Sequence, residues 1–125
     1  MKLKEILVPN FQVAFSKLIS NNNLEVVVAW QLKKILKKYQ EENAQYNEMK
    51  EELIKKYAKL DEDGKPIATD KGLAQFEGEN SDIFHKEAEK LMDVEIELGS
   101  LKLTQLKNIK LTAADLNALE GIIED

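Results

Sequence analysis

One long stretch without helix-breaking residues constrains this chain more than any other feature of its sequence. From about Leu24 to Leu60 there is neither glycine nor proline, the two residues that interrupt helices most strongly. A helix of this span would be about 55 Å long at about 1.5 Å per residue, and it would exceed the roughly 8–20 residues of an ordinary globular helix. We therefore predict one long helix over residues 24–60.

Apolar residues recur along this helix at the spacing of a coiled-coil seam. One seam row holds Leu32, Tyr39, Tyr46, Leu53 and Leu60, and the other holds Ile35, Glu42, Met49 and Lys56. The second row is only half apolar, which weakens the coiled-coil pattern. Core and interface interpretations both stay open, because aromatic residues are enriched at protein interfaces as well as in cores.

A helix of this length in so small a chain is expected to leave part of its apolar seam uncovered. A second copy of the chain is the simplest partner that could bury this exposed seam, so we predict a homo-oligomer. The predicted interface residues are Trp30, Leu32, Ile35, Tyr39, Tyr46, Met49 and Leu53. The start of the helix, Leu24–Trp30, is apolar nearly all round and is expected to be buried on several sides.

Shorter elements are predicted before the long helix. Residues Met1–Val8 alternate loosely and favour a short strand, which Pro9 ends. Pro9 can also open a helix. The apolar face of that helix would hold Phe11, Ala14, Phe15, Leu18 and Ile19. Three successive asparagines, 21–23, end it, and Asn23 is a suitable cap for the long helix.

The second half of the chain mixes helical and extended patterns. A turn at 61–66 precedes a predicted hairpin of residues 65–69 and 73–76, and a helix follows from Asn80 or Ser81 with Phe84, Ala88 and Leu91 on its apolar stripe. Alternation of apolar and acidic residues over 94–98 predicts a strand. We also predict short extended segments at residues 101–103 and 109–111. Thr112 with Asp115 resembles a capping box, opening a helix that buries Leu116, Leu119 and Ile122 or Ile123. The expected fold is α+β, mainly α, in a single domain over 1–125.

Composition excludes several classes of protein. The chain has no cysteine, which removes disulfides, thiolate metal sites and cysteine nucleophiles and mildly favours a reducing compartment. No apolar run approaches the roughly 20 residues of a membrane span, and the N-terminal stretch does not resemble a signal peptide. The net charge is −5 and every basic residue is lysine. We expect no recognition of duplex nucleic acid, because arginine supplies the planar fork that such proteins favour.

Candidate catalytic and metal-binding patterns are incomplete. His85 is the only histidine, and a general base needs a nucleophile and an orienting partner, neither of which the sequence offers. Asp61-x-Asp63-Gly64 fails as a calcium loop at both ends and is predicted to be a turn. The carboxylates of the long helix lack the Glu-x-x-His pairs of di-metal bundles. We therefore expect a protein that is not an enzyme and that uses no cofactor or metal.

Lys33, Lys34, Lys37 and Lys38 form a basic cluster on the long helix. Lysine binds phosphate as a point charge, so the cluster is a candidate site for an anionic ligand such as a nucleotide, or for the acidic face of a partner. The alternative is a solvated face opposite Leu32, Ile35 and Leu36.

Three segments together resemble small, largely uncharacterised phage or prophage proteins of low-GC Gram-positive bacteria. They are Glu51–Tyr57, Leu60–Pro66 and Ile109–Glu120. The resemblance implies a phage origin, a helical fold and a location in the cytoplasm of an infected bacterial host, and it carries over no functional residue. Two functions are expected: a binding protein that inhibits or sequesters a host component, such as a nucleotide immune signal, or a structural or assembly factor, such as a head or tail chaperone.

Overall fold

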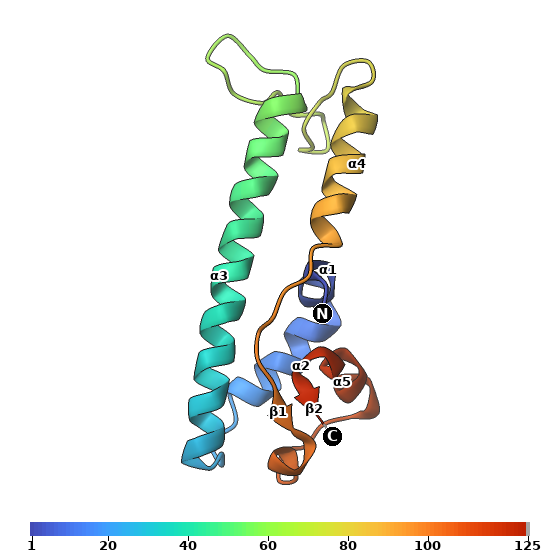
Figure 1. Cartoon of the computed structure of the whole chain (residues 1–125). Coiled ribbons are helices and arrows are strands. Elements are labelled where there is room, and N and C mark those ends of the chain that lie inside the picture. The colour runs from blue at the N-terminus through green and yellow to red at the C-terminus, as the bar shows by residue number, and fades with distance from the viewer. Residues whose placement is uncertain (125) are drawn as a thin grey trace. The chain divides into compact units, whose positions relative to one another are not determined.

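The structure, a computed structural model, describes residues 1–124 and is mainly helical (Figure 1). Its helices are α1 (Leu3–Leu7), α2 (Pro9–Ile19), α3 (Val26–Tyr57), α4 (Asn80–Met92) and α5 (Ala113–Ala118), with 3₁₀ turns at Leu103–Leu106 and Glu120–Ile122. Strands β1 (Leu101–Lys102) and β2 (Ile123–Glu124) pair in parallel, with Leu101 opposite Ile123. The predicted α+β, mainly α fold is confirmed.

The chain forms two compact units. The first unit contains residues 1–43 together with the residues from 95 onward, and the second unit contains residues 44–94. None of the helices in the described residues 1–124 is long and apolar enough to span a membrane.

The predicted long helix is confirmed as α3, which contains 32 residues from Val26 to Tyr57. It begins later than expected because Asn21 and Asn23 form a local turn, in which the Asn23 backbone N–H donates to Asn21 Oδ1 at 2.8 Å. Asn23 therefore does not cap α3. The helix ends at Tyr57 because the next free backbone donor, the N–H of Lys59, turns away to bond Gln75 O at 2.7 Å.

An aromatic cluster joins α2 to α3 in the core of the first unit. Phe11 and Phe15 stack with ring centroids 5.6 Å apart, and Tyr39 lies 5.9 and 5.5 Å from them. Phe11, Ala14, Phe15 and Leu18 are all buried, as their spacing along one helical face predicts. Ile19, at the end of α2, is 40% exposed instead.

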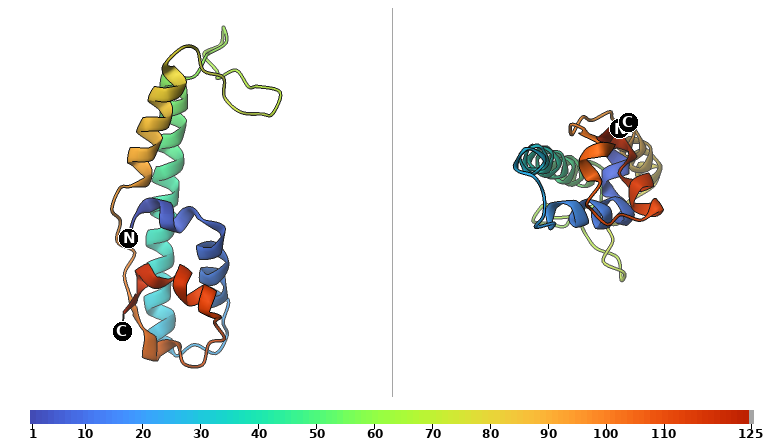
Figure 2. Two further views of the ribbon diagram at one scale, coloured as in Figure 1. Left: turned by 90° about the vertical axis from the view of Figure 1, so that its right-hand side faces the viewer. Right: turned by 90° about the horizontal axis from the view of Figure 1, so that it is seen from below.

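The C-terminal segment completes this core. Leu101, Leu106, Leu119 and Ile122 are buried, and α5 packs against α2 (Figure 2). Of the alternation predicted over 94–98, only the last part is confirmed: Ile96 and Leu98 are buried and Glu97 is exposed, whereas Val94 is 48% exposed. This stretch is extended but is not a strand, and the Ile96 N–H donates to Met1 O at 2.8 Å.

The second unit contains the predicted hairpin pairing. Ala68 bridges Ala74, and the Thr69 N–H donates to Leu73 O at 2.6 Å. The pairing consists of isolated bridges instead of continuous strands. On α4, which was predicted correctly, Phe84 is half-buried and lies against Phe76 with centroids 4.7 Å apart.

Several local predictions at the two ends of the chain are wrong. Residues 1–8 were expected to form a strand, but Leu3–Leu7 form helix α1, because Leu3 and Ile6 are both buried at helical spacing and the Glu5 carboxylate accepts from the Lys2 N–H. Leu103 begins a 3₁₀ turn, and residues 109–111 form a loop. Leu116 is 37% exposed because α5 ends at Ala118, so that the following turns bury Leu119 and Ile122 instead.

The start of α3 is also not buried as predicted. Val26, Val27 and Trp30 are 83%, 60% and 57% exposed, and Val28 is only 3% exposed. Other elements cover one side of α3 here, so a run that is apolar all round still leaves its outer side in solvent.

Candidate functional site

The four lysines of the predicted cluster are all exposed on the first half of α3. They lie away from Leu32 and Ile35, which are each 2% exposed. In the structure, members of this lysine cluster line two different pockets. Lys34 and Lys38, one helical turn apart, line one pocket, whereas Lys33 lines a smaller pocket on another side of α3.

The pocket beside Lys34 and Lys38 lies within the first unit and has a volume of about 670 Å³. One wall is the α3 face that carries Gln31, Lys34, Ile35 and Lys38. The opposite wall comes from the extended backbone at 96–100 and from the last turn and strand of the described chain. Residues far apart in the sequence therefore form this pocket.

Gly99 allows the extended backbone to approach α3 closely. Its φ is +113°, in the region that favours glycine, and a Cβ placed on it would lie 3.2 Å from Ile35 Cγ1. The neighbouring Ser100 Oγ donates to Glu124 Oε1 at 2.7 Å, which ties the wall of the pocket to β2.

The charges of the pocket are mixed but separated between its walls. The α3 wall carries Lys34 and Lys38, and the opposite wall carries Glu97 and Glu124. Within residues 1–124 neither lysine has an ion-pair partner. An anionic group of a ligand would therefore bind at the α3 wall, and hydrogen-bond donors of the same ligand would suit the carboxylate wall.

An exposed aromatic side chain adjoins the lysine cluster. The ring of Trp30 lies 5.6 Å from Lys33 Nζ and 5.5 Å from Lys34 Nζ, measured to the ring centroid. These distances are within the range of cation–π attraction. Together with Val26 and Val27, Trp30 forms an exposed apolar patch at the start of α3.

The other predicted interface residues are not gathered on one open surface. Leu32 and Ile35 belong to the core, and Tyr39 packs on α2. Tyr46 and Leu53 are half-buried, whereas Met49 is 43% exposed. The inner seam of α3 is thus covered by the chain's own residues at Leu32 and Ile35, and a partner cannot reach it there.

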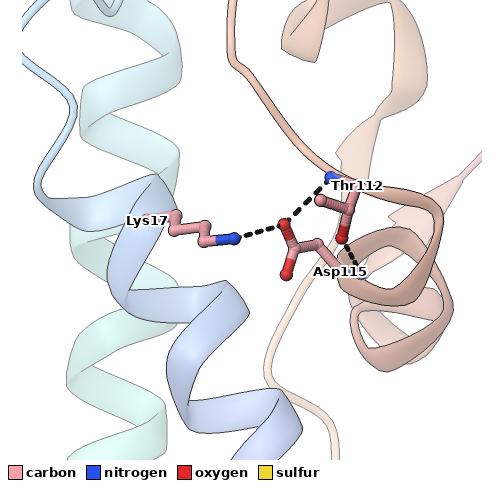
Figure 3. A network of polar contacts seen from close by, with 3 residues as sticks. All are labelled: Lys17, Thr112 and Asp115. Carbon is pink, nitrogen blue, oxygen red and sulfur yellow. Dashed lines mark hydrogen bonds and ion pairs between the residues drawn. The ribbon is translucent and has the colours of Figure 1, made fainter.

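Sequence reasoning missed one polar network, which joins α2 to α5 (Figure 3). Lys17 Nζ donates to Asp115 Oδ2 at 2.7 Å, and the same oxygen accepts from the Thr112 N–H at 2.9 Å. The Asp115 N–H donates to Thr112 Oγ1 at 3.1 Å, which confirms the predicted capping box. The Lys17 hydrogen bond, followed by the Thr112 N–H, lowers the pKa of the Asp115 carboxyl. The network holds two helices together.

The remaining candidate residues lie in the second unit. His85 is exposed, and its Nδ1 lies 2.6 Å from Ser81 O, one turn earlier on α4. Asp61 Oδ1 accepts from the N–H groups of Asp63 and Lys65, each at 2.9 Å, which confirms the predicted turn. The described residues contain no group of three or more His, Cys, Asp or Glu placed to hold a metal ion.

No protein-family description, curated protein or solved structure matches this chain. The resemblance to phage proteins that was predicted from Glu51–Tyr57, Leu60–Pro66 and Ile109–Glu120 stays a prediction, and these segments contain none of the residues that line the Lys34–Lys38 pocket. The properties of this pocket therefore follow from its own geometry and charge.

Proposed function

We propose that this chain is a phage- or prophage-encoded binding protein, not an enzyme, that captures a small anionic ligand in the Lys34–Lys38 pocket. The observation that carries the proposal is that Lys34 and Lys38, one helical turn apart on one wall of that pocket, have no ion-pair partner within residues 1–124. In the cytoplasm of an infected host, such a protein would sequester a host component. A nucleotide signal is a suitable ligand, because its phosphate carries the negative charge that the two lysines would bind.

The shape and lining of the pocket support a ligand of nucleotide size. Its volume of about 670 Å³ lies within the roughly 300–1,000 Å³ of small-molecule sites. Lys34 and Lys38 would bind the phosphate as two point charges. Ile123, which is half-buried, supplies apolar surface for a base, and the carboxylate of Glu97 suits an exocyclic amino group.

Thermal unfolding in the presence of a nucleotide panel tests this proposal. A ligand that binds only the folded state raises the unfolding free energy by about 2.7 kcal/mol at 100 times its dissociation constant. We expect at least one mononucleotide, dinucleotide or cyclic nucleotide to raise the Tm of the wild-type chain. The variant Lys34→Gln/Lys38→Gln should lose this increase, because it removes both positive charges of the pocket.

A matched control is present on the same helix. Lys33→Gln/Lys37→Gln makes the same charge change at the same spacing, but neither residue lines this pocket. This variant should keep the nucleotide-dependent increase in Tm. Equal loss in both variants, or no increase with any nucleotide in the wild type, would contradict the proposal.

A second candidate function, assembly of the virion, is favoured by the exposed patch of Val26, Val27 and Trp30. Exposed tryptophan is enriched among the residues that dominate protein–protein binding. Under this alternative the chain co-purifies with a co-expressed phage head or tail protein and shows no change in Tm with nucleotides. Trp30→Ala should abolish the co-purification, and Lys34→Gln/Lys38→Gln should leave it intact.

A further inference from the structure

Two glutamines form a hydrogen-bond relay that ends at the Lys34–Lys38 pocket. The Lys102 N–H in β1 donates to Gln105 Oε1 at 2.9 Å, and Gln105 Nε2 donates to Gln31 Oε1 at 3.0 Å. Gln31 lies on α3 and lines the pocket, and all the residues of the relay belong to the first unit. The relay therefore connects the α3 wall of the pocket to β1.

The chemistry of the relay fixes which way each side-chain amide points. A backbone N–H can only donate, so the Gln105 atom that meets the Lys102 N–H is the amide oxygen. The Gln105 nitrogen then faces Gln31, and this donor requires the Gln31 oxygen as its acceptor. The NH₂ group of Gln31 is therefore the part of the side chain that the relay leaves unused.

The unused NH₂ group of Gln31 is open to a ligand. Within residues 1–124 it has no hydrogen-bond partner, and none of the buried side-chain nitrogen or oxygen atoms of these residues lacks one. The group therefore lies at the surface, on a side chain that lines the pocket. Together with Lys34 and Lys38, which follow on the same wall, it forms a row of hydrogen-bond donors.

We propose that Gln31 selects the base of a nucleotide bound in this pocket, an inference that rests on the proposed function. Its NH₂ group donates to an oxo group of the base, as in hypoxanthine, guanine or uracil. An amino group at the same place, as in adenine or cytosine, brings donor against donor and leaves both unpaired. About 10.5 Å of helix separates Gln31 from Lys38 at about 1.5 Å per residue, so a ligand whose phosphate is held by the lysines extends along α3 to Gln31.

Inosine 5′-monophosphate and adenosine 5′-monophosphate form a matched pair of probes. They share the phosphate, the sugar and the purine outline, and they differ in the oxo or amino group of the six-membered ring and in the adjacent ring nitrogen. Isothermal titration calorimetry of the wild-type chain should give a dissociation constant about tenfold lower for the inosine nucleotide, because only its oxo group accepts from Gln31.

The wild-type titrations separate this inference from the proposed function. Equal dissociation constants, or tighter binding of the adenosine nucleotide, would overturn the selection by Gln31 and leave nucleotide capture supported. Binding of neither monophosphate would also overturn the inference, whereas the wider nucleotide panel would still decide the proposed function.

The variant Gln31→Glu should reverse the selectivity. One carboxylate oxygen still accepts from Gln105, so the relay is kept, and the other oxygen replaces the NH₂ donor with an acceptor. The added negative charge weakens phosphate binding for both probes, so the readout is the ratio of their two dissociation constants. That ratio should shift toward the adenosine nucleotide by about tenfold or more. An unchanged ratio would overturn the inference.

A matched control is Gln40→Glu, which makes the same charge change on the same helix. Gln40 is exposed, belongs to the first unit and does not line this pocket. This variant should keep the wild-type ratio. An equal shift in Gln31→Glu and Gln40→Glu would show that charge alone changes the ratio, and it would contradict a contact between Gln31 and the base.

A second variant tests Gln105 as the residue that positions Gln31. Gln105→Met removes the donor that orients the Gln31 amide, but it leaves Lys34 and Lys38 in place to bind the phosphate of both probes. The ratio of dissociation constants should therefore move toward one, and far-UV circular dichroism checks that the helices are kept. A wild-type ratio in Gln105→Met would overturn the positioning role of the relay.

Discussion

Asp115 shows how one residue serves both local and long-range structure. Its backbone N–H and its carboxylate close the capping box with Thr112, and the same carboxylate accepts from Lys17 on α2. The local part follows from the Thr-x-x-Asp spacing in the sequence. The lysine lies 98 positions away in the chain, and no local pattern indicates it.

The lowered pKa of Asp115 predicts a specific dependence of stability on pH. Its folded-state pKa lies below the ordinary value of 3.8, so the carboxylate stabilises the fold fully above that value and loses this contribution as pH falls through the folded pKa. We expect Asp115→Asn to be less stable than the wild type at neutral pH. The difference between them should shrink below about pH 4, as measured by urea unfolding at a series of pH values.

Asp82 supplies a control for this measurement. It occupies the same third position of helix α4 that Asp115 occupies in α5, but it is exposed. The stability difference between Asp82→Asn and the wild type should vary less with pH. A constant difference for Asp115→Asn from neutral to acidic pH would contradict the assigned role of the Lys17 contact.

At the scale of the element, α3 has two faces with different roles. Its inner face supplies Leu32 and Ile35 to the core of the first unit, and its outer face carries Trp30 and exposed charged side chains. The heptad pattern placed Leu32 and Ile35 on the inner face correctly, but Met49 is 43% exposed and Leu60 lies beyond the end of α3. The pattern also did not indicate that the chain itself covers Leu32 and Ile35. Sequence periodicity identifies an apolar stripe on a helix, whereas the residues that pack against this stripe depend on the rest of the fold.

Truncation of one apolar residue on each face should separate the two roles. Leu32→Ala should lower the free energy of unfolding by about 2–5 kcal/mol, because it leaves a cavity in a packed core. Val26→Ala should change it by less than about 0.5 kcal/mol, because Val26 is 83% exposed. Urea denaturation measures both values, and similar losses for the two variants would contradict the assignment of the faces.

At the scale of the whole molecule, burial is uneven between the two units. Among the described residues, Ala58 is the only buried apolar residue in the second unit, and all the others belong to the first unit. Helix α4 has no buried residue, whereas α2 has Phe11, Ala14, Phe15 and Leu18. Segments with few buried contacts open at lower free energy.

Amide hydrogen exchange should therefore differ between the units. We expect amides of α4 to exchange faster than those of α2, and amides of α3 after Asn43 to exchange faster than those before it, when each rate is corrected for its intrinsic value. Exchange measured by mass spectrometry on overlapping peptides resolves these segments. Equal protection of α2 and α4 would show that the second unit has a source of stability other than buried apolar side chains.

The sequence alone determined where most helices run, because helix boundaries depend on local causes: Pro9 at the start of α2, the absence of glycine and proline in α3, and the capping box at Thr112. It also identified the lysine cluster. The tertiary structure alone decided which lysines line a pocket and which side of Val26–Trp30 meets solvent, since both depend on where residues 95–124 pack against α3. Contacts between residues so distant in sequence arise from shape and burial across the whole core, and no local spacing encodes them.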